Sequence, residues 1–105
     1  MVTRIWRATS SIEGARSYAG HFKSHVLPEL KTLSGYKGAY LLNRETPKGV
    51  DITVITLWQS LEAIVRFAGQ EITRAVVAEE AQRVLLSYDR EVIHCEVVAS
   101  DGVFE

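Results

Sequence analysis

Residues 50–58 read VDITVITLW, and this stretch decides the fold of the chain. It is rich in Ile, Val and Thr, which favour β-strands, and it contains no glycine or proline. Successive side chains of a strand point to opposite faces of a sheet, so Ile52 and Val54 share one face. Ile55 and Leu57 share the other. Because both faces are apolar, we expect both sides of this strand to be covered.

The segments around this strand supply its partners. Composition predicts strands at residues 2–9, 36–45, 50–58 and 90–98. Helical periodicity predicts helical stretches at residues 11–34, 61–72 and 75–86. The order strand, helix, strand, strand, helix, strand predicts a ferredoxin-like βαββαβ domain of the α+β class, with an antiparallel sheet and helices on one face. We assign residues 1–98 to this single domain and residues 99–105 to a C-terminal tail.

Short-range signals mark the ends of these elements. Ser10 and Glu13 have the spacing of a capping box, which predicts that Ser10 caps the first helix. Pro28 lies inside that helix and should kink or restart it. Residues 46–49 read TPKG, so the strands that they join should form an antiparallel hairpin.

The last strand is also apolar on both faces, since Val92 opposes Ile93 and Val97. Each such side chain left in water would lose ~1.5–3 kcal/mol of the free energy that its burial contributes to stability. The predicted helices belong to the first face and leave none to spare for the second, so we expect a second copy to cover it in a homodimer. Edge loops and the tail are the alternative cover.

Charge and cysteine content exclude several classes of function. Twelve basic and 13 acidic residues give a net charge of −1, so the composition does not indicate a basic surface for nucleic acid or an anionic membrane. No stretch approaches the ~18–20 apolar residues of a membrane span, and no leader is recognisable, so we expect a cytoplasmic protein. Cys95 has no disulfide partner and is expected to be a small buried hydrophobe.

Three polar residues recur at helical spacing in the first predicted helix. His21, His25 and Glu29 form an H-x-x-x-H-x-x-x-E run, which could place metal ligands on one face. At ~100° per residue, His25 lies at the edge of the apolar stripe and His21 turns toward solvent. We therefore interpret the run as a solvated helix flank and predict no metal site.

His94 and Trp58 are the residues most suited to chemistry. His94 is the tentative catalytic base, because histidine titrates near neutral pH; the alternative is a histidine satisfied at the dimer contact. Trp58, Tyr40 and Phe67 could floor a pocket for a flat ligand, with His25 nearby, or could simply be core. The sequence contains no glycine-rich phosphate loop or paired-cysteine site, and we predict no cofactor.

Arg4 and Arg7 stand at opposite parity on the first predicted strand. At most one of them can therefore face the interior of the fold. A buried arginine there would need an anionic partner.

Two motifs resemble those of the antibiotic biosynthesis monooxygenase family. Residues 57–63 (LWQSLEA), followed by 67–69 (FAG), resemble its passage from the third strand to the second helix. Residues 33–38 (LSGYKG) are similar to its entry to the second strand. The resemblance implies a dimeric α+β barrel. Some members of this family oxidise aromatic polyketides with dioxygen and no cofactor, and others degrade haem.

Only part of the family's site residues are matched here. In the polyketide oxidases the resemblance carries over Trp58, but Val54 and Ile64 replace an asparagine and a tyrosine. In the haem degraders, Phe67 and Val77 replace a tryptophan and a histidine. We therefore expect a protein of this type, working as a cofactor-independent monooxygenase of a small aromatic compound. The alternative is a non-catalytic binding or interaction module on the same scaffold.

Overall fold

The computed structural model describes residues 1–102. Residues 103–105 of the predicted tail lie outside this range. Along the chain the elements are β1 (Val2–Ser10), α1 (Ile12–His21), the π-helix η1 (Phe22–Val26), α2 (Leu27–Lys31), β2 (Tyr36–Thr46), β3 (Gly49–Trp58), α3 (Leu61–Ala68), α4 (Glu79–Val84), β4 (Ser87–Tyr88) and β5 (Ile93–Glu96).

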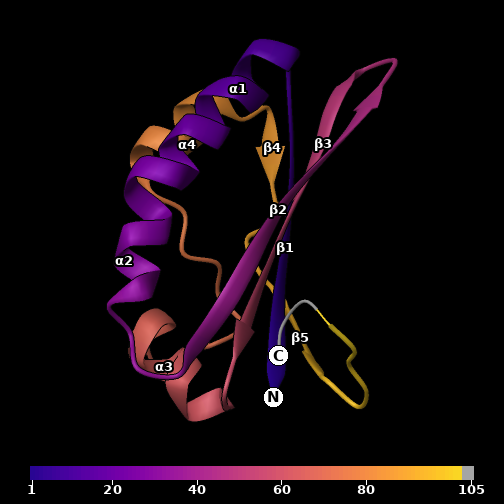
Figure 1. Cartoon of the computed structure of the whole chain (residues 1–105). Coiled ribbons are helices and arrows are strands. Elements are labelled where there is room, and N and C mark those ends of the chain that lie inside the picture. Colours follow the sequence, from indigo (N-terminus) through magenta and orange to yellow (C-terminus); the bar gives the residue numbers. More distant parts are fainter. Residues whose placement is uncertain (103–105) are drawn as a thin grey trace.

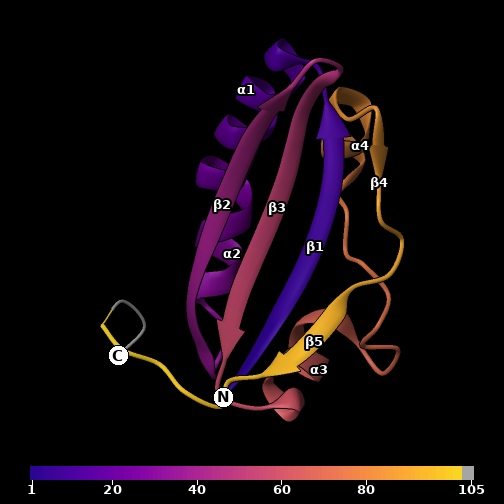
Figure 2. The ribbon, with the colours of Figure 1, turned by 90° about the vertical axis from the view of Figure 1, so that its right-hand side faces the viewer.

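The strands form one antiparallel sheet in the order β2-β3-β1, and both β4 and β5 pair with the far edge of β1. The helices all lie on one side of this sheet, and the other side is open (Figures 1 and 2). The expected α+β ferredoxin-like architecture and the β2–β3 hairpin are therefore confirmed. Within the described residues no helix is long and apolar enough to cross a membrane.

The inner face of the sheet carries the core. Trp6 and Ala8 of β1 and Ile52 and Val54 of β3 are all buried there beneath the helices. A second apolar cluster surrounds Trp58, which is fully buried beside α2 and α3. The β3 pattern of alternating buried and half-buried residues is what one covered face produces.

The outer face carries an apolar row that crosses the sheet in register. Tyr40 pairs with Ile55, Ile55 with Ile5, and Ile5 with Ile93. Ile93 is 58% exposed, and Ile5 and Ile55 are half-buried. Cys95, two residues after Ile93, is also exposed, so the expectation of a buried thiol was wrong. Its parity places it on this outer face, where no helix lies (Figure 2).

The last strand differs from the prediction because it is interrupted. Residues 87–88, expected as a connection, form β4, and Asp89 N still donates to Arg7 O of β1 (2.8 Å). Residues 90–92 then leave β1 before β5 begins. The backbone of this interruption bonds instead to residues 73–75: Val92 N donates to Thr73 O (2.7 Å), and Ala75 N donates to Arg90 O (2.8 Å). We call residues 69–78, which have no regular helix or strand, the strap.

The helices also begin and end differently from the prediction. Ser10 is the last residue of β1, and Ser11 caps α1 by accepting a hydrogen bond from Gly14 N (2.9 Å). The helix predicted at residues 61–72 ends at Ala68, since Gly69 adopts a φ of 82°. The helical piece expected at 75–86 is reduced to the six residues of α4.

The restart at Pro28 is confirmed, and it comes with a π-helical turn. Proline has no N–H to donate to the preceding turn. Immediately before it, Leu27 N donates to Phe22 O, a wider i→i+5 connection. This turn carries His25 and joins α1 to α2, which begins with Pro28 in its first turn. Single π-helical turns of this kind are frequent at functional sites.

Candidate functional site

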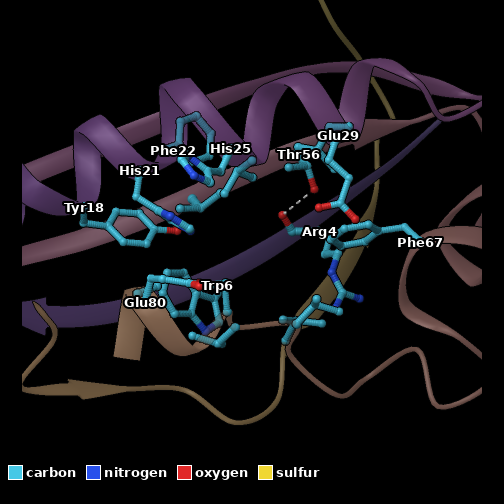
Figure 3. Close-up of a pocket in the computed structure, with 18 residues that line it drawn as sticks. Arg4, Trp6, Tyr18, His21, Phe22, His25, Glu29, Thr56, Phe67 and Glu80 are labelled. Atoms are coloured by element: carbon cyan, nitrogen blue, oxygen red, sulfur yellow. Dashed lines mark hydrogen bonds between the residues drawn. The ribbon is translucent and has the colours of Figure 1, made fainter. Parts of the chain in front are cut away.

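A cavity of about 270 Å³ lies between the inner face of the sheet and the helices (Figure 3). Its floor consists of Arg4 and Trp6 from β1 and Val54 and Thr56 from β3. Pockets for drug-sized ligands span ~300–1,000 Å³, so this space suits a small ligand.

One wall comes from the first helical segment. Tyr18, His21, Phe22, His25 and Glu29 line the cavity from α1, η1 and α2 (Figure 3). Tyr18 and Phe22 are buried, whereas His25 and Glu29 are exposed and lie at the rim. Burial raises the pKa of Tyr18 to about 12, so its hydroxyl remains protonated at neutral pH.

The opposite wall comes from α3, the strap and α4. Phe67 closes one end, and Val76 and Val77 of the strap and Ala81 of α4 continue the lining. The surface is therefore mainly apolar, with Glu80 adding a carboxylate at the exposed edge. An apolar pocket with a few polar groups is typical of small-molecule sites.

The hydrogen bonds of Ser24 fix the tautomer of His25. Ser24 Oγ donates its single proton to the carbonyl of Gly20 (2.8 Å), which can only accept. The second contact of this hydroxyl, 2.7 Å from His25 Nδ1, must therefore be donated by the imidazole. Neutral His25 carries its proton on Nδ1, and Nε2 keeps a free electron pair.

His21 stacks on His25, with ring centroids 5.2 Å apart. Together with Glu29, both histidines line the cavity, while His25 and Glu29 are also exposed, so the run is a solvated flank that forms the rim of the cavity. Within residues 1–102, no group of three or more His, Cys, Asp or Glu side chains could hold a metal ion.

Arg4 is the arginine of β1 that faces inward, and only 5% of its surface is exposed. Its guanidinium donates from Nη1 to Ile72 O (2.5 Å) and from Nη2 to Arg74 O (2.8 Å). The expected anionic partner is not found among the described residues, and these strap carbonyls take its place. Burial lowers the pKa of Arg4 to about 10, so it remains cationic at neutral pH.

His94, the tentative catalytic base, lies beside Arg4 and not among the residues that line the cavity. Its Nε2 is 3.1 Å from Arg4 Nη1, and since a guanidinium only donates, the imidazole accepts. Burial, and then the charge of Arg4, lower the pKa of His94 below its ordinary value. His94 therefore remains neutral and orients the arginine.

The structure separates the aromatic residues that we expected to floor a pocket. Phe67 lines the cavity, but Trp58 lies behind it, donating from Nε1 to Thr56 Oγ1 (2.8 Å) and stacking on Phe67. Tyr40 lies on the outer face, because a register shift between Tyr36 and Gly38 changes the parity of β2. The ring beside Trp58 is that of Tyr36.

Comparisons with known proteins identify the fold. No protein-family model and no curated protein matches the sequence. A solved structure from Bacillus cereus, described as a candidate antibiotic biosynthesis monooxygenase, is 14% identical with a TM-score of 0.66, over 99% of this chain and 97% of that one. The cofactor-independent oxygenase SnoaB of Streptomyces nogalater is 17% identical with a TM-score of 0.62, over 97% of each chain.

A third solved structure is the haem degrader MhuD of Mycobacterium tuberculosis, with two haems in its active site. It is 23% identical with a TM-score of 0.62, over 97% of this chain and 100% of that one. These likenesses confirm that the chain has the fold of the antibiotic biosynthesis monooxygenases. Because all three structures are less than 25% identical to this chain, they show its fold alone, and its chemistry depends on the residues that line the cavity.

Proposed function

We propose that the cavity oxidises a small aromatic compound with dioxygen and without a cofactor, and that His25 is the catalytic base. The observation that carries this proposal is the Ser24–His25 pair, which leaves Nε2 unprotonated on a residue that lines a mainly apolar cavity. The likeness to SnoaB, a cofactor-independent oxygenase, supports the same class of reaction.

The chemistry requires a substrate that becomes electron-rich when it loses a proton, such as an anthrone or a phenol. His25 Nε2 accepts the proton from an anthrone carbon, and the resulting anion passes an electron to dioxygen. Recombination gives a hydroperoxide, which loses water to leave a ketone. The balance is one CH₂ group and one O₂ converted to one C=O group and one H₂O, with the proton on His25 returned to the departing oxygen.

His25 suits this role better than His94. Nε2 of His94 already accepts from the guanidinium of Arg4, so its electron pair is occupied. His25 lines the cavity and makes its hydrogen bond through the opposite nitrogen. We therefore propose that His94 positions Arg4 and does not contact the substrate.

The test is oxygen consumption with a panel of anthrones and phenols, without added metal or flavin. General bases typically contribute ~10²–10⁴-fold to a rate, so His25→Ala should lower turnover by that order. Lys23→Ala, on the same helical turn but outside the cavity lining, is the matched control and should keep full turnover. Undiminished turnover in His25→Ala would contradict the assignment. Ligand binding without turnover by any compound would favour the non-catalytic binding module.

We propose that haem is not the substrate, despite the likeness to MhuD. Phe67 and Val77 both line the cavity with apolar groups at the positions where the resemblance places tryptophan and histidine. Titration with hemin should give no stoichiometric change in the Soret band. A tight complex whose Soret band disappears under a reductant would overturn this.

We also propose that a second copy of the chain covers the outer face. The row Tyr40, Ile55, Ile5 and Ile93 leaves apolar surface that one chain does not bury. A two-fold contact would place equivalent rows against each other. Sedimentation at micromolar concentration should give about twice the mass of one chain, and a monomer would contradict the proposal.

A further inference from the structure

The buried guanidinium of Arg4 has no carboxylate partner among residues 1–102. The ion pairs of the described chain join Arg44 to Asp51, Arg74 to Glu71 and Arg83 to Glu79, all at the surface. Arg4 belongs to none of them, although it is by far the least exposed of these arginines. Arginine is almost never fully buried unless it is paired, so this side chain needs an explanation.

Every acceptor that Arg4 contacts within the chain is neutral. Two are the backbone carbonyls of Ile72 and Arg74, and the third is the imidazole of His94, which accepts through Nε2. These acceptors fix the orientation of the guanidinium but do not neutralise its charge. Glu29 and Glu80 line the same cavity, yet neither forms an ion pair with Arg4. A fixed buried cation without a counter-charge is a site that an anion would complete.

Two of the five N–H groups of Arg4 are available to such an anion, Nε–H and the second N–H of Nη2. The three contacts use Nη1 and Nη2, and Nε–H makes no hydrogen bond within the described residues. No side-chain nitrogen or oxygen in that part of the chain is both buried and unpaired, so Nε is not fully enclosed by the described residues. The cavity is the pocket that Arg4 lines.

The surroundings of Arg4 select the shape of the ligand. The guanidinium carbon lies 5.7 Å from the centroid of the Phe67 ring, which covers one face of the cation (Figure 3). Trp6 and Val54 continue the apolar floor beside it. A flat aromatic body against these side chains would bring an attached anionic oxygen to Arg4.

We propose that Arg4 forms an anion subsite at the cavity floor, which binds the carboxylate or ionised phenolic oxygen of a planar aromatic ligand. The inference rests on the proposed function only in placing an aromatic compound in this cavity. It adds that the ligand is an anion, and it holds whether or not the compound is oxidised.

The test is equilibrium binding by calorimetry with pairs of probes that differ in charge. 2-Naphthoate with 2-naphthamide examines the carboxylate, and 4-nitrophenol with 4-nitroanisole, in mildly alkaline buffer, examines the ionised phenol. The wild-type protein should bind at least one anion about tenfold or more tightly than its neutral counterpart, the size of one charge-assisted hydrogen bond. The pair that shows the preference identifies the source of the anionic oxygen. Equal affinity within both pairs, or no binding of any probe, would overturn the proposal.

Two variants assign the preference to Arg4. Arg4→Met should abolish it, and Arg7→Met, which removes an exposed arginine from the opposite face of β1, should leave it unchanged. A preference that survives in folded Arg4→Met would overturn the assignment. If Arg4→Met does not fold, Arg4→Lys is the deciding variant, because lysine keeps the positive charge but lacks the planar guanidinium. The preference for the anion should then fall at least threefold. An undiminished preference would refute the role of Nε–H.

The failures of the two proposals can be told apart. Selective anion binding without oxygen consumption would sustain the anion subsite and count against the oxygenase. Oxygen consumption that depends on His25, with no preference for anions in binding, would sustain the oxygenase and count against the anion subsite.

Discussion

Val54 and Ile55 are neighbours on β3, yet their side chains lie in different surroundings. Val54 points to the inner face, is 8% exposed, and forms part of the cavity floor under the helices. Ile55 points to the outer face, where it is half-buried in a row of apolar side chains that no helix covers. The comparison teaches that apolar parity alone does not tell which face of a strand the helices of the same chain cover.

The largest loss of stability is expected from a charge placed on the inner face. Ile52 lies on the same face as Val54 but outside the cavity lining that contains Arg4. Ile52→Asp places a carboxylate among buried apolar groups and should destabilise the fold by about 3–5 kcal/mol, the usual penalty of an uncompensated buried charge. Urea unfolding followed by circular dichroism measures this. A loss below about 1 kcal/mol would mean that the two faces do not differ as described.

The matched change on the outer face should act on assembly instead. Ile55→Asp leaves a partly solvated charge within one chain, so each chain should remain folded. Two copies would face each other's carboxylates, and sedimentation should give the mass of a monomer. A variant that stays dimeric would show that the contact lies elsewhere.

A smaller loss of stability is expected from a change at Trp58, at the end of β3. Trp58→Phe removes the hydrogen bond to Thr56 Oγ1 and part of a fully buried ring. We expect a loss of about 1–3 kcal/mol, from the missing bond and the space left behind. Affinity for an aromatic ligand should change little, since Trp58 lies behind the lining. A large loss of affinity without a loss of stability would place Trp58 in the site.

The smallest effect should appear as a dependence of stability on pH. Burial and the charge of Arg4 lower the pKa of His94 in the folded chain, so the folded state binds fewer protons than the unfolded state. The contribution of His94 is therefore present above the ordinary histidine pKa of about 6.5 and declines as the pH falls through and below it. His94→Gln keeps an acceptor for Arg4 but cannot titrate.

Melting temperatures of wild type and His94→Gln between neutral and mildly acidic pH test this point. The difference between the two proteins should shift in favour of the variant as the pH falls. Parallel curves would show that His94 contributes nothing to the pH dependence.

Much of the fold could be predicted because its signals are local. The composition of residues 50–58, the turn at 46–49 and the proline of α2 each act over a few residues, and the structure agrees with them. The interruption after β4 could not be predicted, because residues 90–92 are as compatible with a strand as those of β5. They pair with the strap, a partner remote in sequence.

The site was harder to predict than the fold. The spacing of His21 and His25 drew attention to the correct helix, but not to the cavity whose rim the run forms. Tyr40 was misplaced by one extra residue in β2, since a single-residue shift exchanges the faces of a strand. Arg4 was recognised as one of two alternatives, and only tertiary contacts show that carbonyls surround it.

The strap has a consequence for how this protein could change. Its attachments are made largely through main-chain atoms, at Ile72 O, Thr73 O, Arg74 O and Ala75 N. The side chains of residues 76–78, by contrast, line the cavity. Exchanging those three side chains for others of similar size would leave the main-chain attachments in place. This segment is therefore where new ligand preferences could evolve, or be selected in a library, at little cost to folding.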